Sequence, residues 1–302
     1  MNRSLSLAGL AVAAVLGAGR AAAHDFEYRG VCEASAAARL DGRHFAVASD
    51  ETETLTLYER GRATPVGSVE HANVTDIEAS ARIGDVIFWQ TSHSLNREGQ
   101  DKPKRKLLFA TTVAPGSSPA LVPAGVEFRN LRSMIAPALG LDEAALMPTL
   151  NIEGLAATPE GDLLIGLRAP LSADGRAQLV RIRDPLALVG LGPAGVQARA
   201  EAVPPLDLQG RGIRSIELVG TGAHRYLIVA GPVLDRASPP LLFWWDGAGA
   251  ATPGPAALLG GMTPEALVAW SDRDIQIIGD NGDSCSDESA NPRWFPSIDV
   301  RP

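Results

Sequence analysis

A glutamate recurs at the start of short apolar segments along this chain. Carboxylate oxygens are the ligands that hard cations such as calcium prefer. If the repeated segments come together in the fold, Glu78, Glu153, Glu217 and Glu265 are expected to hold a divalent cation such as calcium. The five copies of the pattern are Cys32–Ser35, Asp76–Ala79, Asn151–Gly154, Ser215–Leu218 and Thr263–Ala266.

Other polar residues stand beside these glutamates or at the ends of the apolar segments that follow them. We expect Arg168 and Arg214 to bind an anion and His93 to hold a proton, so these three are the candidate catalytic residues. Crowded carboxylates repel one another, and interleaved arginines or a cation would relieve the repulsion. The pattern favours a metal-assisted hydrolase of a small anionic or phosphorylated ester. The residues expected to contact the ligand are Asp50, Asn151, Ser215 and Asp280.

Two other interpretations of the same residues remain open. The glutamates could hydrogen-bond backbone amides of neighbouring repeats and fix their register. The same polar site could also belong to a non-catalytic module that binds a ligand or a protein partner. The chain contains no GxSxG, HExxH or phosphate-binding glycine loop, so no standard nucleophile, zinc or nucleotide motif decides between them.

The elements that would position these residues are short strands in groups of three or four. Each repeated glutamate opens an apolar segment, and a short turn then leads to a second one, as in Phe45–Ala48, Val86–Trp89 and Tyr226–Val229. Turn residues such as Asp41-Gly42 separate the two segments, which is typical of antiparallel hairpins. Strands in fours with few helices predict an all-β fold, a β-propeller of five blades.

Two insertions lengthen this array. Apolar residues at helical spacing predict a short helical insertion between blades two and three, over Asn130–Gly140 and Asp142–Met147. We expect it to overhang the mouth of the central channel. Pro185–Gly195 is rich in Gly and Pro and is expected to form a loop.

The last repeat lacks a fourth strand, and the segment Phe26–Val31 is a candidate to supply it. Such an arrangement would close the ring with a strand from the other end of the chain. Cys32 follows that segment, and Cys285 follows the second strand of the last repeat. An exported chain with two cysteines favours a disulfide between them, which would lock the closure.

The composition bounds the class of protein. The chain has 302 residues, 45% hydrophobic and 21% charged, which is ample for a sizeable core. Residues 1–23 combine a positive start, a charge-free apolar run and Ala21-Ala22-Ala23, which predicts a cleaved signal peptide and a periplasmic or secreted protein. Residues 24–302 would then form a single propeller domain without a membrane span.

The charge of the chain limits its partners. Cleavage would remove two arginines and take the net charge from −8 to −10. Such an acidic protein repels nucleic acid and anionic membranes, so nucleic acid is not an expected partner. We expect a small anionic molecule or a protein partner instead.

Four stretches of the chain resemble the bacterial DUF3616 family, a domain of unknown function. They are Cys32–Ala36, Asp76–Ala79 with Thr91–Asn96, Asn151–Ala156 with Leu164–Arg168, and Ile213–Glu217. Glu33 stands where the family pattern has Asp. The resemblance implies an exported, propeller-like protein without an assigned reaction, so it supplies no catalytic residues. A more distant likeness to exported esterase-like phytases and calcium-dependent propeller lactonases is an analogy of fold.

Overall fold

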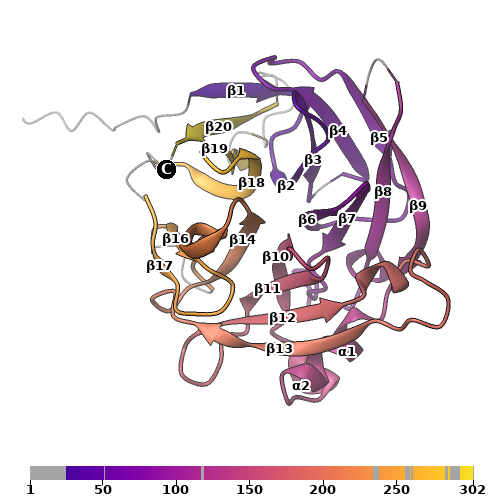
Figure 1. Ribbon diagram of the computed structural model, residues 1–302, viewed down its shortest axis with the longest axis vertical. Helices are drawn as coiled ribbons and strands as arrows, with labels where there is room; N and C mark the ends of the chain where they lie inside the picture. The colour runs from indigo at the N-terminus through magenta and orange to yellow at the C-terminus, as the bar shows by residue number, and fades with distance from the viewer. Residues whose placement is uncertain are drawn as a thin grey trace, which may run out of the picture.

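The described part of the protein is a ring of five antiparallel sheets around a central channel (Figure 1). The computed structural model describes residues 25–301 except 51, 117–118, 234–237, 256–258, 260, 283–284 and 286–292. Each sheet has four strands, so the fold is the five-bladed β-propeller that the sequence predicts. The predicted signal peptide at 1–23 lies outside the described residues. Within them, no helix is both long enough and apolar enough to cross a membrane.

Each blade runs from an inner strand at the channel to an outer strand at the rim. Blade one contains β2 (Ala34–Arg39), β3 (His44–Ser49), β4 (Thr54–Glu59) and β5 (Gly67–Glu70). Blade two contains β6 (Ile77–Ile83), β7 (Val86–Thr91), β8 (Leu108–Ala114) and β9 (Ala120–Phe128). Blade three contains β10 (Asn151–Ala157), β11 (Leu163–Ala169), β12 (Ala177–Arg183) and β13 (Arg199–Leu206). Blade four contains β14 (Gly212–Leu218), β15 (Tyr226–Gly231), β16 (Leu241–Trp245) and β17 (Thr252–Pro253). Blade five contains β18 (Thr263–Ser271), β19 (Asp274–Asp280), β20 (Trp294–Val300) and β1 (Phe26–Arg29).

The first and last strands of the chain close the ring, as predicted. β1 pairs antiparallel with β20, and Tyr28 lies opposite Phe295. The two rings stack with centroids 5.2 Å apart, inside a cluster that blades five and one share. The predicted disulfide between Cys32 and Cys285 is present, with an S–S distance of 2.00 Å. Closure therefore combines strand pairing, aromatic packing and a covalent link.

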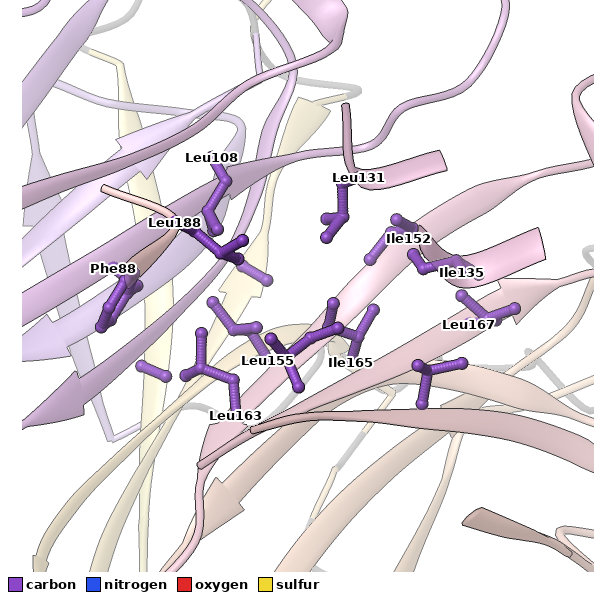
Figure 2. Packing of buried hydrophobic residues seen from close by; sticks show 14 of the residues in the cluster. Phe88, Leu108, Leu131, Ile135, Ile152, Leu155, Leu163, Ile165, Leu167 and Leu188 are labelled. Atoms are coloured by element: carbon purple, nitrogen blue, oxygen red, sulfur yellow. The ribbon is translucent and has the colours of Figure 1, made fainter. Parts of the chain in front are cut away.

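Apolar side chains on both faces of the sheets pack between neighbouring blades. Figure 2 shows the contact between blades two and three, where Phe88 and Leu108 meet Leu155 and Ile165. All four side chains are at most 1% exposed. Every inner strand is thus held from both sides, which gives the channel a rigid wall.

The helical insertion between blades two and three is confirmed, but its expected position is wrong. α1 (Leu131–Ala138) and α2 (Glu143–Leu146) lie at the periphery beside β13, away from the channel (Figure 1). Leu131 and Ile135 are buried in the cluster between blades two and three. Packing of this apolar face holds the helix at the periphery of the ring. The other short helices are η1 (Pro103–Arg105), η2 (Pro185–Ala187) in the second insertion and η3 (Gly222–His224).

Candidate functional site

A β-bulge interrupts the start of all five inner strands at the same place. In β6, Ile77 pairs with Thr91 and Ala79 pairs with Gln90, so Glu78 is the extra residue. A bulge re-aims the side chain it carries. We call the mouth the end of the channel where the inner strands begin and these bulges lie. The five bulged residues are Ser35, Glu78, Glu153, Arg214 and Glu265.

The bulges correct the register of the repeat in two blades. In blade one Ser35, rather than Glu33, holds the bulge position. In blade four the bulged residue is Arg214, and Glu217 lies three residues further along β14. The pair Ile216-Glu217 imitates Ile77-Glu78 in sequence, which explains the misalignment. The pair Ile213-Arg214 is the true equivalent, so in blades two, three and four the isoleucine before the bulge marks the position, whatever residue follows it.

Glu153 is the centre of an ion-pair network at the mouth. Its Oε1 lies 2.7 Å from Nη1 of Arg168, and its Oε2 lies 3.3 Å from Nε of Arg214. The Nδ2 of Asn151 donates a further hydrogen bond of 2.9 Å to Oε1. Nη1 of Arg214 also pairs with Oε1 of Glu265. Two glutamates and two arginines therefore alternate in one connected chain of charges.

Burial strengthens this network. Glu153 is 4% exposed and Glu265 is 9% exposed. Burial alone would lower the pKa of Arg214, but the charges of Glu265 and Glu153 outweigh it and raise that pKa. The arginine therefore stays protonated between its two carboxylates.

Two glycines make room for the arginines. A Cβ on Gly231 would lie 2.4 Å from Cδ of Arg214, and one on Gly212 would lie 2.0 Å from the carbonyl oxygen of Arg168. Atoms cannot approach this closely, so any side chain at Gly212 must displace β14 from the backbone of Arg168.

Gly212→Ala is therefore expected to lower the free energy of unfolding by about 3 kcal/mol, the upper range for overpacking a tight site. The matched control is Gly42→Ala, because a Cβ at Gly42 meets nothing within 4 Å. Urea denaturation of both variants measures the difference, and an equal effect at the two positions would contradict this close packing.

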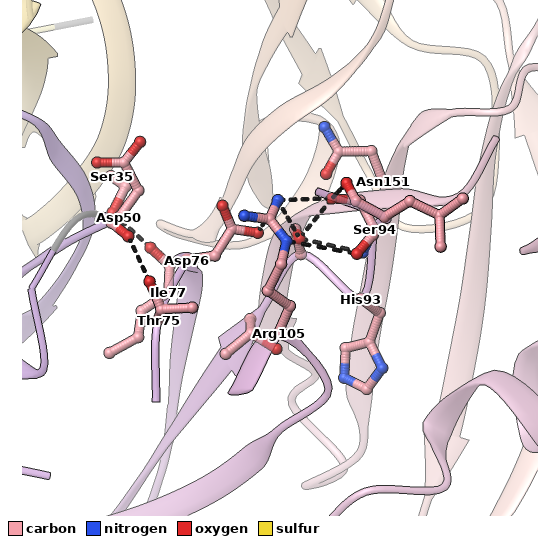
Figure 3. A network of polar contacts seen from close by, with 12 residues as sticks. Ser35, Asp50, Thr75, Asp76, Ile77, His93, Ser94, Arg105 and Asn151 are labelled. Carbon is pink, nitrogen blue, oxygen red and sulfur yellow. Dashed lines mark hydrogen bonds and ion pairs between the residues drawn. The ribbon is translucent and has the colours of Figure 1, made fainter. Parts of the chain in front are cut away.

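A second network connects blade two to the mouth (Figure 3). Nη2 of Arg105 lies 2.6 Å from Oδ2 of Asp76 and donates a 2.8 Å hydrogen bond to Oγ of Ser94. Asp76 and His93 both have left-handed backbones, with φ of 65° and 53°. Such conformations are costly outside glycine and often occur at functional sites. The sequence did not single out Arg105, because it belongs to a basic run with the pattern of a solvated loop.

His93 is not part of the site. Figure 3 shows its ring pointing away from the network around Arg105. The side chain is fully buried, and burial together with the charge of Arg132 lowers the pKa of His93 to about 3. Arg132 of α1 donates a 2.9 Å hydrogen bond from Nε to the carbonyl oxygen of His93. His93 thus positions the backbone after β7, and its buried ring lies outside the proposed site (Figure 3).

The other predicted residues are distributed around the mouth. The carbonyl oxygen of Asp50, at the end of β3, accepts a hydrogen bond from the backbone N–H of Asp76. Asp280 ends β19 opposite Thr263, and its Oδ1 accepts a hydrogen bond from the N–H of Gly282. Ser215 faces the channel. Burial and nearby carboxylates, first Asp76, raise the pKa of Glu78 well above its usual value.

The four glutamates expected to hold a cation have different surroundings. Glu153 and Glu265 form ion pairs with arginines, whereas no ion pair within the described part of the chain involves Glu78 or Glu217. Across the described residues, no three Asp, Glu, His or Cys side chains converge as a metal site would require. The donor set therefore does not fit a cation shared by all four glutamates.

A small cavity lies in the channel below the mouth. Its volume is about 10 Å³, which is room for about one water molecule. Glu78 and Glu217 line it together with Ser35, Ser80 and Ser215. Burial raises the pKa of Glu217 to about 8. Its carboxyl group is therefore largely protonated at neutral pH.

A larger cleft opens beside the mouth, across blades two, three and four. Its volume is about 790 Å³, within the range of small-molecule sites. Much of its lining is apolar, and its charged residues among those described are Arg97, Arg168 and Arg211, with no acid. We call this space the cleft. It is lined by Ser94–Arg97, Gly99, Pro148–Asn151, Arg168–Leu171, Gln209–Arg211, Pro232, Val233 and Ser238.

Comparisons with solved structures find propellers of low sequence identity. The glutaminyl cyclase of Myxococcus xanthus is 17% identical with a TM-score of 0.48, and the match covers 93% of this chain and 97% of that chain. The PQQ-bound aldose sugar dehydrogenase of Streptomyces coelicolor is 12% identical with a TM-score of 0.45, over 90% and 96% of the two chains. A gluconolactonase of Xanthomonas campestris is 10% identical with a TM-score of 0.38, over 91% and 77%. These similarities carry no information on activity.

No curated protein matches the sequence significantly. Residues 148–257 match the model of a family described as "Protein of unknown function (DUF3616)". This range contains two of the four stretches on which the resemblance rests, Asn151–Ala156 with Leu164–Arg168 and Ile213–Glu217. The chain is thus a five-bladed propeller whose resemblance to the DUF3616 family is supported over residues 148–257.

Proposed function

We propose that the protein binds a small anionic organic molecule in the cleft. Arg211 is the observation that carries this proposal. Its Nε donates a 3.1 Å hydrogen bond to the carbonyl oxygen of Pro239, and its Nη1 donates one of 3.1 Å to that of Gln209. Backbone carbonyls orient the guanidinium without neutralising its charge, and it pairs with no carboxylate among the described residues.

Arg168, Arg214 and Arg105 differ from Arg211 in this respect. Glu153 pairs with Arg168 and Arg214, and Asp76 pairs with Arg105. Their charges are therefore largely balanced within the protein. A held, unbalanced cation beside an apolar wall suits a carboxylate or phosphate attached to an apolar body.

The proposed function is binding alone, and no reaction of the ligand is included in it. The alternative of a hydrolase assisted by a metal depended on four glutamates that share a cation, and two of these face arginines instead. Export to the periplasm or the medium stays a prediction from residues 1–23.

Arg211→Gln is expected to weaken binding of hexanoate at least about tenfold, because a hydrogen bond to a charged group contributes about 1.5–3 kcal/mol. Isothermal titration calorimetry measures the affinity. The control is Arg176→Gln, since Arg176 pairs with Asp174 at an exposed place, with side chains 52% and 59% exposed. Equal affinities of the intact protein and Arg211→Gln would overturn the proposed site.

A further inference from the structure

The floor of the cleft, formed by Asn151 and Arg168, has an unused acceptor. Asn151 donates from Nδ2 to Glu153, while its Oδ1 is buried with no hydrogen-bond partner among the described residues. A buried acceptor without a donor is unfavourable, because it has lost its hydrogen bond to water. A bound group that carries an O–H or N–H would remove this cost. Figure 3 shows the Asn151 amide on the same side as Arg105 and Ser94.

The floor also has an unused donor. Arg168 donates from Nε to the carbonyl oxygen of Pro232 at 3.1 Å and from Nη1 to Glu153 at 2.7 Å. Neither hydrogen bond uses its Nη2, and the described residues give this nitrogen no acceptor. Because Glu153 balances its charge, Arg168 can donate a hydrogen bond to a ligand but presents little net positive charge to it.

From this arrangement we propose that the floor takes a neutral polar group of the ligand, a hydroxyl or a carboxamide, while Arg211 holds the anionic end. This inference rests on the proposed function and specifies the ligand class. The ligand is then a hydroxy acid or an amide acid with an apolar middle. Either group donates to Oδ1 of Asn151 and accepts from Nη2 of Arg168.

A second anionic group does not fit the floor. A carboxylate cannot donate to Oδ1 of Asn151, and the buried charge of Glu153 lies directly behind both floor residues. Dicarboxylates should therefore bind less tightly than hydroxy acids of the same length.

The experiment compares butanoate, hexanoate and octanoate, each with and without a terminal hydroxyl, and adipate as the dicarboxylate. Calorimetry on the intact protein should show that the hydroxyl improves affinity about tenfold at the chain length that spans the cleft, as expected for one or two hydrogen bonds. Asn151→Ala should bring the affinity ratio of hydroxylated to plain acid close to one. Arg211→Gln should weaken both acids equally and leave that ratio unchanged.

The outcomes separate the two proposals. Plain and hydroxylated acids that bind equally, with both dependent on Arg211, would overturn the neutral floor and keep the anion site. Tighter binding of adipate than of hydroxyhexanoate would also overturn it. Failure of all these acids to bind would overturn the anion site and this inference with it. The ratio also distinguishes recognition from damage to the fold, because a structural effect of Asn151→Ala weakens both acids alike.

Discussion

Glu153→Gln is expected to lower the free energy of unfolding by about 3 kcal/mol. The substitution keeps the shape of the side chain and removes the charge that Arg168, Arg214 and Asn151 all contact. Removing one partner of a buried ion pair leaves the other charges without compensation, which is strongly destabilising. If Glu153 belonged to a group of carboxylates that only repel one another, the same change would leave stability unchanged or raise it.

Urea denaturation at neutral pH measures this effect. Glu201→Gln is the control, because Glu201 pairs with Arg183 at the surface, with side chains 47% and 40% exposed. Exposed pairs of this kind contribute little to stability, because water and salt screen their charges. Similar losses in the two variants would show that the network at the mouth is no stronger than a surface ion pair.

Glu217→Gln is expected to have the opposite effect at alkaline pH. Burial raises the pKa of Glu217 from 4.5 to about 8, so the folded protein holds this proton more tightly than the unfolded chain. The stabilisation that comes from this tightly held proton of Glu217 is complete below about pH 4.5. It is lost as the pH rises to about 8, because the folded protein must then ionise a carboxyl group that is poorly solvated. The loss is on the order of 5 kcal/mol, since one pKa unit corresponds to about 1.4 kcal/mol.

Glutamine is neutral throughout this range, so the variant should lose less stability between mildly acidic and alkaline pH and be the more stable protein above about pH 8. Urea denaturation at several pH values gives the slope. Glu78, whose pKa is also raised, should leave a residual slope of the same sign. The exposed Glu70 provides the control position. Identical slopes for the intact protein and Glu217→Gln would contradict a protonated carboxyl group in the channel.

The fold could be predicted from the sequence because its signals are local. Alternating apolar segments and turn residues indicate hairpins, and two cysteines allow a single intramolecular pairing. The closing strand Phe26–Arg29 was predictable since the last blade lacked a partner for Trp294–Val300. The helices were predictable, but their position depends on packing against β13, which no local pattern shows.

The site was less predictable because its residues are far apart in the sequence and meet only when the blades form a ring. Asp76 and Arg105 are brought together only after the long loop that follows β7 folds back. Arg214 meets Glu265 only when blades four and five pack side by side. The repeated sequence pattern contains an acid and therefore favours Glu217 over Arg214. The feature that the structure repeats is a backbone bulge, which accommodates a side chain of either charge. The cleft and its Arg211 arise from loops of three blades.

The five bulges also have a consequence for how such a protein can diversify. Each blade presents one residue to the mouth through the same distortion of its backbone, and the natural occupants already include a serine, three glutamates and an arginine. The backbone distortion is therefore independent of the charge of the residue that it presents, so the charge of the mouth can change without a new loop or strand. Neighbouring bulges must change together, because Glu153, Arg214 and Glu265 balance one another. Libraries that vary these five positions as adjacent pairs, and keep the hairpins intact, should yield folded propellers with mouths of different charge.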